Sequence, residues 1–471
     1  MKFKKKYIKL IPAFTALVLT GLFFWYLFAN PVKDFTATLP GLDNRGSGGL
    51  MDEINIGEFF KRFRQSETQT SESWPRFRGA DFDNIYKPDR NLISDFSGGK
   101  GEILWSHELG EGHAGPAIYD GKVYLLNYDE DERADMLHCY DLRTGEELWR
   151  RWYNVNIRRN HGMSRTVPAI TEDFILTMGP RLHVMCLDRE TGDLLWSIDI
   201  EREYESETPL WYTGQCPLID NGVAILATGG KALMIGVDCA TGEKLWEVPN
   251  PDGWNMSHSS VMPYTFNGVK MYIYSAIGGA FAVSENGEVL WKLPEWSSNV
   301  IAPSPLAMPD GRILFTAGYG AGSMMVQLNE ENGEFSTEIL YQYRPREGLA
   351  SEQQTPIYWE GYLFGVMPKD AGVNRNRMVC VHPNDPTEIV WASDSESRYG
   401  LGPFILADGK FYLLNDDGVL HIIEADTRSF RHLDSKEIIE NGHDAWAPLA
   451  IADGYMVLRD ADRMVCININ N

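Results

Sequence analysis

A strand-opening signature that recurs eight times is the strongest constraint on the fold of this chain. Each copy has a proline, two or three apolar residues, a turn and an aromatic-rich strand. Successive prolines are 42 to 52 residues apart, and they are Pro116, Pro168, Pro217, Pro263, Pro305, Pro356, Pro403 and Pro448. A period of this length is typical of the four-stranded blades of a β-propeller. The sequence therefore predicts an all-β, eight-bladed propeller.

A second motif, Asp-x-x-Thr-Gly-x-x-x-Trp, ends several of these units. It is complete in residues 139–149, 186–196 and 236–246. Asp and Thr-Gly favour a tight turn, and the strand after it ends on a large ring that can be buried between blades. We therefore predict structural, inter-blade roles for Trp105, Trp149, Trp196, Trp246, Trp291 and Trp391.

The two ends of the repeat region indicate how the ring closes. Residues 101–109 have the pattern of a last strand with no earlier strands of its blade before it. Residues 447–469 supply three strands with no fourth strand after them. We expect the two segments to form one blade, because an open ring would leave unpaired strand edges. The predicted propeller spans residues 74–471.

These motifs resemble the PQQ-like repeat of the quinoprotein alcohol dehydrogenase-like superfamily. The segment WPRFRG (74–79) is also similar to one found in bacterial proteins of this group. The resemblance covers residues 74–471 and implies the propeller fold. Because one fold hosts many functions, it implies no activity by itself.

PQQ-dependent dehydrogenases of this superfamily resemble one another in a vicinal Cys-Cys disulfide, a Trp floor, a calcium held by Glu and Asn, and an Asp base. This sequence has no Cys-Cys, and no acid and amide pair can be assigned to calcium. It is therefore more similar to non-catalytic members, such as the propeller lipoprotein of the outer-membrane assembly machine. We expect no bound cofactor and assign no catalytic residue; a PQQ-dependent dehydrogenase with a reduced site is the alternative.

The six cysteines indicate neither a disulfide framework nor a zinc site. No CxxC occurs, and four of the cysteines share one repeat position, where small buried residues fit. These four are Cys139, Cys186, Cys380 and Cys466.

The N-terminus has the pattern of a membrane anchor. Five lysines at positions 2, 4, 5, 6 and 9 precede residues 10–29, which carry no charge. Twenty apolar residues suffice to cross a bilayer, and the lysines favour the cytoplasmic side. We predict a cytoplasmic Lys patch and single-pass signal anchor over 1–30, with the propeller in the periplasm or outside the cell. A cleaved signal peptide is less favoured, since residues 27–29 make a poor cleavage site.

Residues 31–73 have the composition of a linker. Within it, residues 54–65 allow one short amphipathic helix with Ile56, Phe59, Phe60 and Phe63 on one face.

The charge balance argues against a nucleic-acid partner. The net charge is -23, and residues 31–471 alone carry 38 bases against 66 acids, or -28. A body this acidic repels phosphate backbones. The expected partners are an unidentified envelope protein and, through the N-terminal helix, the membrane.

Candidate site residues lie in the connections just before each proline, because the loops at one end of a propeller channel usually carry function. The predicted channel-mouth residues are His113, His161, Arg165, Trp211, Gln215, His258, Gln353, Arg398, Tyr399, His443 and Asp444. Three interpretations remain open for them: a polar, water-filled pore, a site for a small ligand or peptide, and a metal site. We assign no metal, because residues around a wide channel seldom converge on one ion.

Beside the dehydrogenase alternative, two functional hypotheses follow from these features. The first is a membrane-anchored, extracytoplasmic propeller that acts as a protein-interaction scaffold or as an envelope ligand-binding module. The second is a small-molecule or carbohydrate sensor that uses the channel mouth. His443 and Asp444 have the residue types of a base and its orienting acid, but no nucleophile accompanies them.

Overall fold

The computed structural model describes residues 11–28 and 54–471, which belong to two separate compact units. In the first unit, helix α2 spans Ile11–Phe28. Within the described ranges, no helix combines the length and apolarity that a membrane span requires. The predicted transmembrane helix is therefore not found there; Leu10 and Ala29, which end the predicted stretch, lie outside the described residues.

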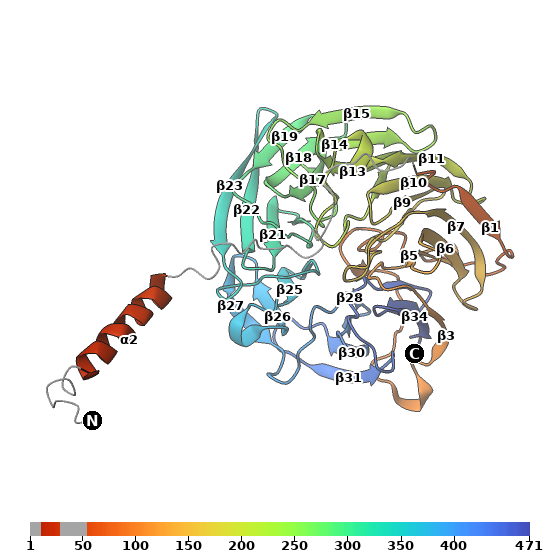
Figure 1. Cartoon of the computed structure of the whole chain (residues 1–471). Helices are drawn as coiled ribbons and strands as arrows, with labels where there is room; N and C mark the ends of the chain where they lie inside the picture. Colours follow the sequence, from red (N-terminus) through yellow and green to blue (C-terminus); the bar gives the residue numbers. More distant parts are fainter. Residues whose placement is uncertain (1–10, 29–53) are drawn as a thin grey trace, which may run out of the picture. The chain divides into compact units, whose positions relative to one another are not determined.

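The second unit is an eight-bladed propeller, as predicted, with its sheets arranged around a common axis (Figure 1). Each blade is an antiparallel sheet whose four strands A to D run from the axis outward. Strand A begins within two residues of the repeat proline, where an unpaired inner edge tolerates the missing N–H.

The strands of blades 1 to 4 have the following bounds. Blade 1 has β4 (Ala117–Tyr119), β5 (Lys122–Asp129), β6 (Ala134–Asp141) and β7 (Glu147–Asn154). Blade 2 has β8 (Ala169–Ile170), β9 (Phe174–Met178), β10 (His183–Asp188) and β11 (Leu194–Asp199), followed by the short helix α3 (Ile200–Glu203). Blade 3 has β12 (Leu218–Asp220), β13 (Val223–Gly229), β14 (Ala232–Asp238) and β15 (Lys244–Pro249). Blade 4 has β16 (Met262–Phe266), β17 (Val269–Ala276), β18 (Gly279–Ser284) and β19 (Val289–Leu293).

The strands of blades 5 to 8 complete the ring. Blade 5 has β20 (Leu306–Ala307), β21 (Arg312–Ala317), β22 (Gly322–Glu331) and β23 (Glu334–Tyr343). Blade 6 has β24 (Ile357–Trp359), β25 (Tyr362–Val366), β26 (Met378–His382) and β27 (Asp385–Ala392), with the 3-10 turn η2 (Gly372–Asn374) between β25 and β26. Blade 7 has β28 (Phe404–Ala407), β29 (Lys410–Leu414), β30 (Val419–Glu424) and β31 (His432–Glu437). Blade 8 has β32 (Ala450–Ala452), β33 (Tyr455–Arg459), β34 (Arg463–Asn468) and the early strand β3 (Ile103–Glu108), which follows the 3-10 turn η1 (Ser97–Gly99).

The turn between strands A and B explains why the signature so often contains Asp-Gly or Asn-Gly. In blade 1, Asp120 and Gly121 have φ of 48° and 67°. Two successive left-handed residues match a type I′ hairpin, whose twist fits antiparallel strands. The same pair of positive φ values occurs at Asn221-Gly222, Asn267-Gly268, Glu360-Gly361, Asp408-Gly409 and Asp453-Gly454.

The recurrent tryptophans dock against the Thr-Gly turn of the next blade. The indole N–H of Trp105 donates to the Leu142 carbonyl at 2.8 Å, and a Cβ on Gly145 would lie 2.5 Å from the Trp105 ring. Trp196 repeats this arrangement with the Cys239 carbonyl and Gly242. The turn therefore needs glycine both for its positive φ and for the room that the ring occupies.

The ring closes as predicted. Strand β3 pairs antiparallel with β34, and Trp105 lies opposite Cys466. Blade 8 therefore takes its outer strand from the start of the repeat region and its other three strands from the end. All six cysteines are buried and free, so the shared repeat position holds small core residues and no disulfide.

The short helix predicted within residues 54–65 is wrong. Residues Phe59–Arg62 form strand β1, which pairs antiparallel with the outer strand β7. Gly57, with φ of 72°, interrupts any helix there. The ring of Phe60 lies 5.8 Å from the ring of Trp149, so Phe60 covers part of the outer edge of blade 1. The described part of the expected linker is thus bound to the propeller.

A segment before the repeats crosses the channel. Trp74 exchanges two backbone hydrogen bonds with Ile118 of blade 1. Arg78 is buried and donates to the carbonyls of Phe82, Thr355 and Pro356, the last two in the connection to blade 6. Strand β2 (Ile85–Tyr86) then pairs parallel with β28 of blade 7. The Ile170 backbone of blade 2 also donates to the Pro75 carbonyl, so the segment joins blades 1 and 2 to blades 6 and 7. We name residues 74–86 the crossing segment.

Arg78→Ala is expected to destabilise the propeller by roughly 3–5 kcal/mol, because the carbonyls of Phe82 and, at the start of blade 6, of Thr355 and Pro356 lose their donor. Chemical denaturation measures this change. Arg428→Ala is the matched control: Arg428 is 86% exposed, and its loss should change the free energy of unfolding by less than about 0.5 kcal/mol. A change below about 1 kcal/mol in Arg78→Ala would show that the crossing segment does not hold the ring together.

Candidate functional site

The connections that lead into the blades gather at one end of the channel and enclose a pocket of about 110 Å³. Seven of the eight connections contribute to its lining; only the connection from blade 6 to blade 7 does not. Phe77 of the crossing segment also lines the pocket. The pocket is therefore a funnel whose walls are formed by the connecting loops and by Phe77 of the crossing segment.

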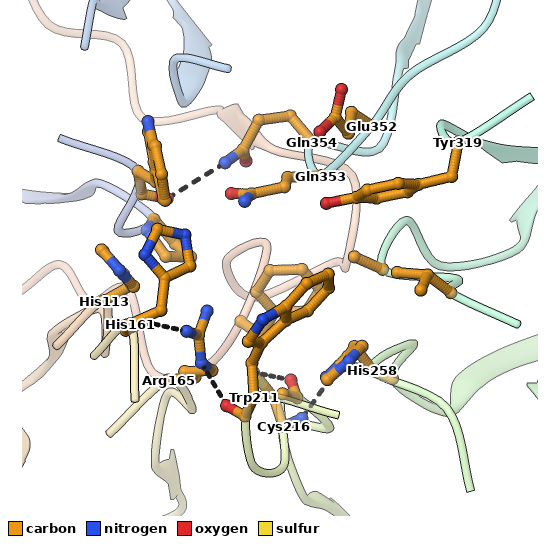
Figure 2. Close-up of a pocket in the computed structure, with 17 residues that line it drawn as sticks. His113, His161, Arg165, Trp211, Cys216, His258, Tyr319, Glu352, Gln353 and Gln354 are labelled. Carbon is orange, nitrogen blue, oxygen red and sulfur yellow. Dashed lines mark hydrogen bonds between the residues drawn. The ribbon is translucent and has the colours of Figure 1, made fainter. Parts of the chain in front are cut away.

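Six of the eleven predicted residues line this pocket. They are His113, His161, Arg165, Trp211, His258 and Gln353. Figure 2 shows Arg165, His161, Trp211, Gln353 and Tyr319 around the same open centre. These residues come from blade connections that are far apart in sequence.

Aromatic rings form a nearly continuous belt around the pocket. The ring of His113 lies 4.9 Å from Trp446 and 6.0 Å from His161. Trp211 stacks on His258 at 6.3 Å and also lies 6.0 Å from Tyr319 and 6.4 Å from His161. The walls therefore offer flat apolar faces to whatever enters the funnel.

Arg165 supplies the only cationic side chain in the pocket lining. Its Nε donates to the Trp211 carbonyl at 2.7 Å, and Nη2 donates to the His161 carbonyl. These two bonds hold the connections into blades 2 and 3 together. Burial lowers the pKa of Arg165 to about 10, so the guanidinium still carries its charge at neutral pH.

The three pocket histidines are neutral at neutral pH. Burial, followed by the nearby Arg165 charge, lowers the pKa of His113 well below its usual value and that of His258 to about 3. The pKa of His161 is lowered by the same two causes. The positive charge of the lining is thus confined to Arg165.

The opposite wall carries one acid, and it already has a partner. Glu352 is 3% exposed and forms an ion pair of 2.8 Å with Lys369. The Lys369 ammonium lies 5.1 Å from the centre of the Tyr319 ring. Gln354 donates to the Trp446 carbonyl at 3.2 Å, which joins this wall to the connection into blade 8.

Backbone strain concentrates at the pocket. His161, Trp211 and Tyr319 have φ of 54°, 63° and 54°, and Tyr212, which follows Trp211, has φ of 72°. Bulky residues rarely adopt this left-handed conformation, and it persists where the surrounding structure imposes it. Three of the aromatic lining residues are therefore held in costly conformations that aim their rings at the funnel.

Five predicted residues lie outside the pocket lining, each for a local reason. Gln215 is fully buried and makes two bonds of 2.9 Å with the backbone of Ala227. Arg398 donates to the carbonyls of Val373 and Arg375, and Tyr399 is buried against His421. His443 and Asp444 are about half exposed, with 3.9 Å between their closest nitrogen and oxygen. That distance exceeds a hydrogen bond, so the hypothesis of a base and its orienter lacks the required contact.

Sequence reasoning missed several lining residues. Three of them lie in the connections just before the repeat prolines: Trp446, Glu352 and Gln354. Their position in these connections was the signal that could have identified them. Tyr319 lies between strands B and C of blade 5, and Phe77 lies in the crossing segment. Nothing in the repeat pattern places these last two at the channel mouth.

The described residues hold no group of three or more His, Cys, Asp or Glu side chains suited to a metal ion. In the pocket, one imidazole stacks behind Trp211 and another lies against Trp446, so the histidines do not point at a common centre.

The family comparison agrees with this architecture. Residues 133–384 match the family model described as "Outer membrane protein assembly factor BamB". The chain belongs to this family. A search of the curated proteins finds no match.

Solved structures similar to this BamB-family chain share its fold. BamB from Moraxella catarrhalis has a TM-score of 0.51 at 12% identity, covering 78% of this chain and 100% of that chain. A europium-containing methanol dehydrogenase has a TM-score of 0.60 at 10% identity, covering 84% and 98%. A quinohemoprotein alcohol dehydrogenase from Comamonas testosteroni has a TM-score of 0.58 at 12% identity, covering 84% and 80%. Identities this low establish the propeller and no activity.

The residues of the pocket do not fit the quinone and calcium apparatus expected of the enzymes with this fold. The lining has a single cysteine, Cys216, and the residue from the crossing segment is Phe77. Its only acid, Glu352, is already paired with Lys369. The donor set therefore lacks both the vicinal cysteines and a free acid for calcium.

Proposed function

We propose that this BamB-family protein is an extracytoplasmic ligand-binding propeller whose funnel at the channel mouth holds a small molecule. The observation that carries the proposal is the convergence of seven blade connections and the crossing segment on one aromatic pocket. Concave sites with apolar walls and a few polar groups are typical of small-molecule sites. Left-handed backbone at His161, Trp211 and Tyr319 adds support, because such strain clusters at ligand sites.

Binding is favoured over catalysis by the chemistry of the lining. Its serine, Ser260, accepts a hydrogen bond from the Cys216 backbone, and the pKa of the Cys216 thiol is raised by burial to about 11. No lining residue thus combines a nucleophile with a base that activates it, which acyl transfer requires.

The proposed location is the cell envelope, with the chain attached to a membrane through its N-terminus. The support is the sequence, in which a Lys patch precedes the uncharged residues 10–29, together with the name of the family. Five lysines favour retention of the N-terminus in the cytoplasm.

His161→Ala should abolish the thermal stabilisation that a bound small molecule gives, because His161 contacts the open centre of the funnel. A fragment screen by thermal shift on the full chain supplies the ligands. His443→Ala is the matched control, since His443 lies in an equivalent connection but outside the lining. Equal loss of binding in both variants, or no stabilising fragment at all, would contradict the proposed function.

Attachment to the membrane predicts that the full chain stays in the pellet after alkaline carbonate extraction. A variant with two arginines inserted after Val18 should move to the supernatant, because charges at the centre of the stretch oppose insertion. Intact-mass measurement distinguishes the anchored form from a cleaved one. Release of the unaltered chain by carbonate would exclude this mode of attachment.

A second candidate function, a protein-interaction scaffold, is favoured by family membership and by the outer strands of the blades. Leu195, Leu245 and Leu340 lie on β11, β15 and β23 and are 40–50% exposed. The equivalent Leu148 on β7 is 2% exposed, and its carbonyl accepts hydrogen bonds from the chain just after β1. Strand β1 and the residues just after it therefore cover the leucine position on the outer strand of blade 1, whereas the same position is exposed on blades 2, 3 and 5.

The scaffold function predicts that a photo-crosslinking residue at Leu195, Leu245 or Leu340 captures one discrete protein in intact cells. The same residue at Val373 serves as the control, since Val373 is 81% exposed but lies in η2 and not on an outer strand. Absence of a discrete adduct at all three leucines, or the same adduct at Val373, would count against strand-edge docking.

A further inference from the structure

Three arginines lie around the channel, and they differ in how their N–H groups are used. Arg78 and Arg459 are buried, whereas Arg165 is partly exposed. Arg78 donates to three carbonyls. Arg459 donates to four, those of Gly110, Ala114, Asp460 and Ala461. Arg165 makes two such bonds, through Nε and Nη2, and its Nη1 makes none among the described residues. A guanidinium has five N–H donors in a fork that suits a two-oxygen acceptor.

Arg165 also has no carboxylate partner among the described residues, whereas three nearby acids, Glu111, Glu352 and Asp416, are occupied. Glu111 pairs with Arg159 at 2.6 Å and accepts from the Gly162 backbone. Glu352 pairs with Lys369, and Asp416 accepts from the indole N–H of Trp446 at 2.9 Å. Asp444 is half exposed and lies beside His443. The unmatched charge in the pocket is therefore positive, single and fixed in position.

The surroundings of Arg165 are flat rings. Arg165 donates a hydrogen bond to the backbone carbonyl of Trp211. The ring of Trp446 lies 5.2 Å from the ring of His161. In Figure 2 the space in front of the guanidinium is bounded by His161, Trp211, Gln353 and Tyr319. Aromatic faces favour offset or edge contacts with another ring, each worth about 0.5–1.5 kcal/mol beyond its buried area.

We propose, building on the binding function above, that the funnel takes a small monocarboxylate with a flat aromatic ring. Its carboxylate lies on the free N–H groups of Arg165, and its ring lies among Trp211, Tyr319 and Trp446. Gln353 contributes an amide that can donate to the same carboxylate or to a ring substituent.

The charges select this class over its competitors. A phosphate dianion would meet one fixed cation and three neutral imidazoles, which leaves part of its charge unmatched. An amine would face Arg165 with a like charge and no free acid in the lining. A neutral ring would fit the walls but would leave the guanidinium without an oppositely charged partner.

The test measures the affinity of the full chain for four probes by isothermal titration calorimetry at constant ionic strength. The probes are benzoate, its neutral isostere benzamide, benzylamine and acetate. Benzoate should bind about 10-fold to 100-fold more tightly than benzamide, because a hydrogen bond to a charged group is at stake. It should also bind more tightly than acetate, which lacks the ring.

Variants assign the effect to Arg165. Arg165→Gln should weaken benzoate binding to the level of benzamide, while Arg165→Lys should fall between the two because it keeps the charge and loses the fork. Arg398→Gln is the control, since Arg398 lies in another blade connection outside the lining and donates to backbone carbonyls. Thermal denaturation of each variant tests whether it is folded. If a variant does not fold, the order of affinities of the unaltered chain for the four probes still tests the proposal.

The outcomes separate this proposal from the function on which it is built. If benzamide or benzylamine binds as tightly as benzoate, with loss in His161→Ala, the funnel is a binding site but not for a carboxylate. If benzoate binding survives in Arg165→Gln, the anion site lies elsewhere and the proposal is wrong. If neither these probes nor any screened fragment binds, the proposed binding function fails as well.

Discussion

The contact between a tryptophan and the Thr-Gly turn of the next blade is the interaction on which the ring depends. At two blade boundaries one N–H bond fixes the orientation of the indole, as between Trp196 and the Cys239 carbonyl beside Gly242. The contact is directional, because the ring needs a turn without a Cβ, so successive blades can stack in only one register. This explains why the motif couples Gly and Trp across four residues: each unit presents a turn to the blade before it and a ring to the blade after it.

An eight-bladed ring creates a channel that its inner strands alone do not fill, and the chain solves this with a segment outside the repeats. Residues 74–86 cross between opposite blades and satisfy buried carbonyls through Arg78. The crossing segment stabilises the ring and also places Phe77 in the funnel. Stability and site geometry are therefore linked, since the same segment serves both.

Local and periodic features of the fold were predictable from sequence, and long-range ones were not. The eight strand openings, the structural tryptophans and the split blade follow from turn chemistry and spacing, and all are confirmed. Strand β1 was predicted as a helix because Phe59, Phe60 and Phe63 match a helical period, but the unpaired edge of β7 offers backbone bonds that no sequence period reveals. The same limit holds for the site. Connections that point inward bring six predicted residues together, whereas Gln215 and Tyr399 turn into the core to satisfy local contacts.

The pocket combines features that folding alone does not favour. The partly exposed guanidinium of Arg165 keeps free N–H donors at the funnel, and left-handed φ at Trp211 and Tyr212 is unfavourable for bulky residues. Arg459 shows that this fold can saturate a buried arginine with carbonyls, so the open fork of Arg165 is not forced by the architecture. Neutral histidines beside it keep the charge at one point and avoid a diffuse positive cavity. An unpaired charge and backbone strain in the same few residues are better explained by a binding role than by the requirements of the ring.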